Sequence, residues 1–231
     1  MGQKDWAMKP YRQFTLDDIQ IKIHRLVFLI PGMDPLGVVT KFFYVIPKKT
    51  YGHFLEKILI GHFPELAKYK KTAGYKNGTI FVSSFLEEGN HEKKYGQQKP
   101  GAELLKNLIH EAGHVFEQNY YDMLFIDPAL KSEFLKTRRR VASIFGDETG
   151  SWVSNAEDAE GFSAFLEKKG FSEVRTKTIG FLPNPYCLDS LSEFIAYCFE
   201  EFFMRDRKMV EGISPTIFSI LSEVSRGQQE I

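Results

Sequence analysis

Apolar residues in the first half of the chain follow the short patterns that are typical of β-strands. They either alternate with polar residues or form brief runs of β-branched and aromatic residues, bounded by Pro, Gly or an Asn-Gly turn. We predict strands at three segments, which are Ile19 to Ile30, Val38 to Ile46 and Thr79 to Ser83. Between the last two, apolar residues at helical spacing predict a helix over Tyr51 to Phe63 that covers one face of the sheet.

From Gly101 onward, apolar residues recur at the three- and four-residue spacing of amphipathic helices. Helices are predicted over residues 101–121, 129–145, 156–169, 188–208 and 214–225. Ser214 is the expected N-cap of the last helix, with Pro215 at its first position. A sheet in the first half and helices in the second half indicate an α+β fold, in which the small twisted sheet packs on the helix at 101–121.

The 231 residues, of which 43% are hydrophobic, are enough for one well-packed domain, and no stretch resembles a flexible linker. We predict a single domain over residues 1–231, in which residues 1–18 form a loosely ordered N-terminal extension. The longest apolar run, Leu26 to Ile30, is too short to cross a bilayer, so no membrane span is expected. Cys187 and Cys198 would lie about 16 Å apart on one helix, beyond the reach of a disulfide.

Charge gives no reason to expect a polyanionic partner. Thirty basic and thirty acidic residues cancel, which removes any argument from overall charge for binding to nucleic acid or to an anionic membrane surface. The basic runs Lys48-Lys49, Lys70-Lys71 and Arg138-Arg139-Arg140 are interpreted as solvated faces of the folded chain. We expect no nucleic-acid partner, and we expect a monomer.

Residues 110–114 read His110-Glu111-Ala112-Gly113-His114, an HExxH motif inside the predicted helix at 101–121. Residues four apart on a helix lie on the same face, so both imidazoles can bind one metal ion. Two histidines leave room on Zn²⁺ for a third protein ligand and a water, whose pKa the ion lowers to about 7. Glu111 would lie beside the ion as the general base. The plainer interpretation, two histidines on a half-exposed helix, fits less well because the apolar stripe buries this helix.

The third zinc ligand has two main candidates among the downstream carboxylates. Glu193 lies in a segment that is apolar on nearly every side, where burial of a lone carboxylate costs on the order of several kcal/mol and a metal ion would remove that cost. Ser190 and Glu193 also have the spacing of a capping box, which is a purely structural explanation. Glu160 belongs to an acidic helix start with Glu157 and Asp158, which the helix dipole explains by itself.

The segment Tyr186-Cys-Leu-Asp-Ser-Leu-Ser-Glu193-Phe-Ile-Ala-Tyr-Cys-Phe, together with HExxH, resembles the signature of the anthrax lethal factor-like metallopeptidases, which include the clostridial Pro-Pro endopeptidases. In that family a tyrosine lies seven residues before the glutamate that opens the ligand helix, as Tyr186 lies before Glu193 here. The resemblance implies a zincin-like fold of the gluzincin type and one Zn²⁺ per chain bound by His110, His114 and Glu193. It also implies that Glu111 is the catalytic base and that Tyr186 supports the transition state.

Two departures from the family pattern bear on the site. Tyr197 stands where the ligand helix of the family has a second glutamate, and an insertion at about Asp127 to Lys177 lengthens the distance from His114 to Glu193. The spacing of the large toxin would fit Glu160 better, but Val153 stands where its preceding tyrosine would be required. The insertion is expected to carry two added helices and to shape the substrate groove.

The leading functional prediction is a zinc-dependent endopeptidase that is secreted or delivered to a target cell as a toxin or effector. A protein or peptide substrate would lie extended along an exposed strand edge at Thr79 to Ser84. One alternative is an intracellular regulatory metallopeptidase in the cytoplasm, because the N-terminal residues lack the apolar core of a secretion signal. The other is a catalytically inactive lethal factor-like domain that only binds, although its HExxH motif is intact.

Overall fold

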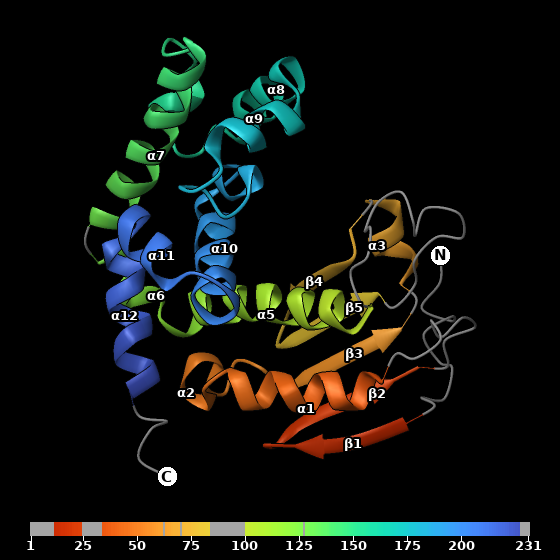
Figure 1. Cartoon of the computed structure of the whole chain (residues 1–231). Coiled ribbons are helices and arrows are strands. Elements are labelled where there is room, and N and C mark those ends of the chain that lie inside the picture. Colours follow the sequence, from red (N-terminus) through yellow and green to blue (C-terminus); the bar gives the residue numbers. More distant parts are fainter. Residues whose placement is uncertain are drawn as a thin grey trace. The chain divides into compact units, whose positions relative to one another are not determined.

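The structure is a computed structural model that describes residues 12–24, 34–61, 63–69, 71–83, 100–126 and 128–226 (Figure 1). The chain divides into two compact units, Met1–Val115 and Phe116–Ile231, and the boundary falls inside one continuous helix, α5 (Pro100–Asn119). All described strands belong to the first unit, and the described residues of the second unit form helices and turns. The predicted α+β fold is therefore confirmed, whereas the single-domain interpretation of residues 1–231 stays a prediction.

The first unit contains a five-stranded mixed sheet that packs on α5. Its strands are β1 (Arg12–Leu16), β2 (Ile19–Ile23), β3 (Lys57–Gly61), β4 (Ala73–Lys76) and β5 (Thr79–Ser83), in the order β1-β2-β3-β5-β4. The inner pairs β2–β3 and β3–β5 are parallel, whereas the outer pairs are antiparallel. Ile21, Ile58 and Ile80 are in register across the three central strands and are fully buried. Because side chains alternate along a strand, this row forms the centre of one buried face.

The segment Val38 to Ile46 is helical, so the strand predicted there is wrong. It belongs to α1 (Pro35–Val45), whose N-cap Asp34 accepts a hydrogen bond from the Leu36 backbone N–H at 3.1 Å. Val39 and Phe42 are fully buried at helical spacing. The start signal was the Asp34-Pro35 pair, because Asp caps helices and Pro fits their first turn. Figure 1 shows α1 and α5 side by side along the sheet, and a Cβ on Gly101 would lie 3.3 Å from Val38.

The helix predicted over Tyr51 to Phe63 is also wrong. A short helix, α2 (Lys48–Tyr51), ends at Tyr51, and β3 follows as the central strand of the sheet. Ile58 and Ile60 are fully buried, whereas Leu59 between them is only partly buried, which is the alternation of a strand. A further short helix, α3 (Pro64–Lys68), leads toward β4.

Strand β5 is confirmed, but the predicted substrate edge at Thr79 to Ser84 is wrong over Thr79–Ser83, and Ser84 lies outside the described residues. The Asn77-Gly78 turn folds β4 back along β5, and β3 pairs with its other side, so both sides of β5 are hydrogen-bonded. The edges of the described sheet are β1 and β4. β1 lies within the part expected to be a loose N-terminal extension, and it pairs with β2 over its whole length. Of the first predicted strand, β2 is confirmed, and Leu26 to Ile30 lies outside the described residues.

The second unit is helical and is built around aromatic side chains. After the end of α5 it comprises α6 (Tyr121–Phe125), α7 (Ala129–Phe145), η2 (Ser151–Val153), α8 (Ala159–Lys169), α9 (Phe171–Thr178), η3 (Pro185–Leu188), α10 (Leu191–Met204), α11 (Arg207–Ile213) and α12 (Pro215–Arg226). Several buried rings pack edge-on or tilted, as Phe134 does on Phe194 at 5.4 Å and Trp152 on Phe165 at 4.6 Å. Such packing supplies most of the stability that the helices lack alone.

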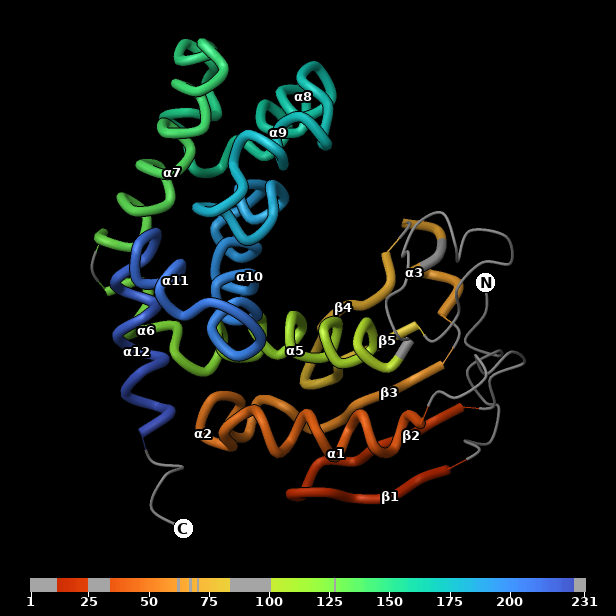
Figure 2. Tube along the Cα trace, in the orientation of Figure 1, coloured from red at the N-terminus to blue at the C-terminus, as the bar shows by residue number. Residues whose placement is uncertain are grey.

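The described helices of the second unit agree with the prediction except at three places. The first is α6, a separate short helix that directly follows α5 and was not predicted. The helix expected over 188–208 is divided, because Asp206 caps a separate helix, α11, through the backbone N–H groups of Lys208 and Met209. α9 adds a third helix to the insertion, which was expected to carry two. Figure 2 traces α10 into α11 and α12, and both of these helices contact α10.

Both cysteines belong to the second unit, and they are not on one helix. Cys187 lies in η3 and Cys198 in α10, and both are buried free thiols.

In the part of the chain that the structure describes, we find no helix with the length and apolar character needed to cross a membrane.

Candidate metal centre

Helix α5 brings the two motif histidines together because they are one turn apart. The rings of His110 and His114 lie with their centroids 5.4 Å apart and their planes at 85°. Both side chains are half-buried, whereas Ile109, Ala112 and Val115 are fully buried. The apolar residues therefore fix the rotation of the helix, and the histidines emerge from its other face.

Glu193 comes from the first turn of α10. The hydroxyl of Ser190 accepts a hydrogen bond from the Glu193 backbone N–H at 3.1 Å, so Ser190 is the helix N-cap that the sequence predicted. Phe194 and Ile195 are fully buried, while Glu193 itself is half-buried. The cap fixes the start of the helix, and the apolar neighbours fix the direction in which Glu193 points.

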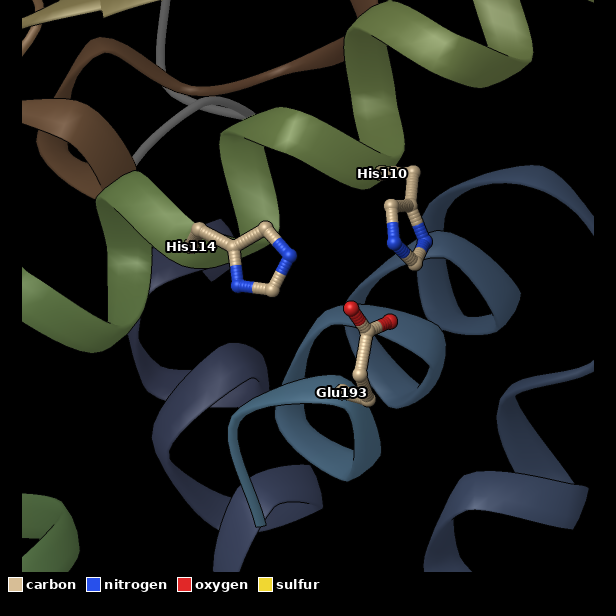
Figure 3. A group of neighbouring side chains, drawn as sticks. All are labelled: His110, His114 and Glu193. Carbon is tan, nitrogen blue, oxygen red and sulfur yellow. The ribbon is translucent and has the colours of Figure 1, made fainter. Parts of the chain in front are cut away.

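One ligand atom from each of His110, His114 and Glu193 can be chosen so that all three lie within 4.8 Å of one another. Figure 3 shows the Glu193 carboxylate directed toward the two imidazole rings. Imidazole nitrogen and carboxylate oxygen are both common zinc ligands in proteins. This group of two imidazoles and one carboxylate could hold a metal ion. Glu160 is exposed on α8 and is not part of it.

Contacts inside the second unit tie the end of α5 to α10. The hydroxyl of Ser192 on α10 donates a hydrogen bond to the carboxylate of Glu117 on α5. One residue earlier on α5, the ring of Phe116 packs against Phe199 at 5.4 Å. Glu117 lies one turn after His114, and Ser192 directly precedes Glu193. Within the second unit, these contacts join the C-terminal end of α5 to the first half of α10.

Glu111, the predicted base, is buried on α5, with 6% of its surface exposed. Its position between the two histidines follows from the motif, and its role stays a prediction. Burial disfavours the charged form of a carboxylate unless a partner stabilises it.

Tyr186, the second predicted catalytic residue, lies in η3. The side chain of Asn184 accepts a hydrogen bond from its backbone N–H at 3.0 Å, which starts the turn. Its ring is stacked on Phe171 of α9 at 4.9 Å and is 50% exposed. The phenol is thus packed against the insertion on one face and exposed on the other, and its role in the site stays a prediction.

Sequence reasoning missed two further polar residues on the Glu193 face of α10. Tyr197 and Glu200 follow Glu193 at positions i+4 and i+7, which is the spacing of one helix face. Burial raises the pKa of Tyr197 well above its usual range, and the negative charges of Glu193 and Glu200 raise it further. Tyr197 is therefore a neutral phenol at any physiological pH. The signal was present in the sequence, where Tyr197 was noted only as a departure from the family pattern.

Comparison with known protein families, with curated proteins and with solved structures finds no match to this chain.

Proposed function

We propose that the chain is a zinc-dependent endopeptidase with one Zn²⁺ bound by His110, His114 and Glu193. The observation that supports this is the convergence of a downstream glutamate on the two histidines of an HExxH helix. Two histidines and one glutamate are the protein ligands of many catalytic zinc sites, and three protein ligands leave a position for water or substrate. The resemblance to the lethal factor-like metallopeptidases supports the same reaction.

Each residue of the site has a defined task in peptide hydrolysis. A bound Zn²⁺ would polarise the scissile carbonyl and lower the pKa of the attacking water. Glu111 accepts the proton of that water and passes it to the leaving amine. Tyr186 donates a hydrogen bond to the oxygen on which negative charge develops. The substrate is proposed to pair with an edge strand, β1 or β4, because only an edge leaves main-chain groups available for pairing.

Metal analysis and a peptide library together test the proposal. The purified chain should carry about one zinc per molecule and cleave peptides, and the activity should disappear on chelation and return with added Zn²⁺. His110→Ala should lose both metal and activity. A wild-type chain that cannot be loaded with zinc would overturn the proposal. A chain that holds zinc and binds peptides without cleaving any would support the alternative of an inactive binding domain.

The place of action is proposed to be outside the producing cell or inside a target cell. A regulatory peptidase of the cytoplasm is the alternative. The neighbouring genes and the N-terminus of the protein isolated from its source distinguish them, because a delivered toxin carries or is accompanied by a means of export.

Replacement of Tyr186 by Phe is expected to lower kcat by roughly 10²–10³ with KM almost unchanged, as for a donor used mainly in the transition state. Phe keeps the ring stacked on Phe171, so the fold should be unaffected. Steady-state kinetics on one library-derived peptide measure the effect. A kcat within about threefold of wild type would make Tyr186 a packing residue only.

A further inference from the structure

The middle arginine of the run Arg138-Arg139-Arg140 is fully buried, so the interpretation of this run as a solvated face is wrong for it. Arg139 and Arg140 are exposed. Arg138 belongs to the buried stripe of α7, four residues after Phe134 and three before Val141, both fully buried. Spacing by three and four residues places it on the apolar face of the helix.

The guanidinium of Arg138 uses all of its N–H groups. Nε and Nη2 donate to the carbonyl of Leu188 at 3.0 and 2.7 Å, and Nη2 also donates to that of Asp189 at 3.1 Å. Nη1 donates to the carbonyls of Trp152 and Asn155, each at 2.8 Å. A guanidinium has five N–H donors in a fixed planar arrangement, and here each has an acceptor. No other cationic side chain can match this pattern.

The charge of Arg138 is retained despite its burial. Burial lowers its pKa to about 10, while the carboxylates of Asp158, Asp189 and Glu157 act in the opposite direction. The guanidinium also lies over the rings of Phe134 and Phe162, with its carbon 4.5 and 5.6 Å from their centres. Burial of a cation without a directly bonded carboxylate is costly, and here the five hydrogen bonds to backbone carbonyls offset that cost.

What Arg138 orders is the segment between Tyr186 and Glu193. Leu188 and Asp189 lie in the middle of this segment, and it is hydrogen-bonded on either side of them. The Asp189 backbone N–H donates to the carbonyl of Tyr186 at 3.0 Å, and Ser190 caps α10 at Glu193. A displacement of Leu188 and Asp189 would therefore move both the phenol of Tyr186 and the carboxylate of Glu193.

The geometry points to Arg138 as the positioning residue of the site, which holds Tyr186 and Glu193 at one fixed separation and joins them to the insertion. This inference rests on the proposed function. It gives the insertion at 127–177 a task, since Arg138, Trp152 and Asn155 all belong to it. A peptidase active site requires such support, because misplacement of a reacting group by about 1 Å can cost roughly 10²-fold in rate.

The test compares Arg138→Gln and Arg138→Lys with the matched control Arg139→Gln, its exposed neighbour on the same helix. The first readout is hydrogen exchange of the metal-free protein, which requires no activity. In Arg138→Gln, amides of the 184–194 segment should exchange roughly tenfold or more faster, while those of α12 keep their protection. Arg138→Lys should be intermediate, because an ammonium has three donors. Equal loss of protection across the second unit would show a merely structural role and overturn the inference.

The second readout is whether the effect of Arg138→Gln on kcat depends on the hydroxyl of Tyr186. Arg138→Gln should lower kcat by about 10²-fold with little change in KM, but only about threefold or less when Tyr186 is already Phe. Its zinc affinity should fall roughly 10–100-fold, as for loss of a residue that orients a metal ligand. The same full effect on kcat in the Tyr186→Phe background, together with unchanged zinc affinity in Arg138→Gln, would overturn the inference.

Failure of the proposed function is separable from failure of this inference. If the wild-type chain binds zinc but cleaves nothing, hydrogen exchange and zinc affinity still decide whether Arg138 orders the segment from Tyr186 to Glu193. Unchanged exchange and unchanged zinc affinity in Arg138→Gln would overturn the inference even if the wild type is a peptidase.

Discussion

Substitution of Glu111 by Gln is expected to leave about one zinc per chain and to lower kcat by roughly 10²–10⁴. Gln occupies nearly the same volume in this buried position, so the helix should keep its packing. The amide cannot accept the proton of the attacking water, and Glu111 is not among the three residues that could bind the ion. Metal analysis and single-turnover kinetics measure the two quantities separately.

His110→Ala is the matched control for Glu111→Gln, because it lies on the same helix one residue away. It should lose metal and activity together, whereas Glu111→Gln loses activity alone. If Glu111→Gln kept more than about a tenth of the wild-type kcat, the general base would have to be sought elsewhere.

Replacement of Glu193 by Ala is expected to weaken zinc binding by more than the roughly 10–100-fold that loss of an outer-shell residue costs. Activity should be lost with the metal, because the ion would retain two protein ligands instead of three. Glu160→Ala is the control, since Glu160 is an exposed carboxylate of a helix start and lies outside the metal group. Zinc content after dialysis against a mild chelator compares the two variants.

One outcome would reverse the assignment of Glu193 as the third zinc ligand. If zinc is lost from Glu160→Ala and retained by Glu193→Ala, the third ligand is Glu160, and Glu193 is only part of the α10 capping box. Equal retention in both variants would show that the ion is held by other groups.

The sequence allowed the helices of the second unit to be predicted better than the elements of the first. The helix expected over 129–145 is found as Ala129–Phe145, because an apolar stripe over several turns has one arrangement that buries it. Val38 to Ile46 and Tyr51 to Phe63 were assigned the wrong elements. Such segments are short, and their structure depends on partners distant in the sequence, as β3 depends on β2 and β5.

The site was predictable to the extent that its geometry is local. His110 and His114 lie on one helix, so their spacing alone implies a shared ligand. Glu193 is distant in the sequence, and no spacing rule connects it to the histidines. It was singled out by the resemblance and by its apolar surroundings. The burial of Arg138 could have been predicted only from its spacing relative to the apolar residues of α7. The two neighbouring arginines made the run resemble an exposed charged face.

Chemical labelling of the buried thiol of Cys187 can report the opening of the turn that carries Tyr186. Cys187 directly follows Tyr186, and burial raises its pKa, with the charge of Glu193 adding to the effect. Only a thiolate reacts with alkylating reagents, so a closed segment protects the residue both sterically and electronically. The rate of alkylation at Cys187 therefore reports how often the turn that carries Tyr186 opens. Cys198, on α10, provides an internal reference in the same molecule, and mass spectrometry measures the alkylation of both residues.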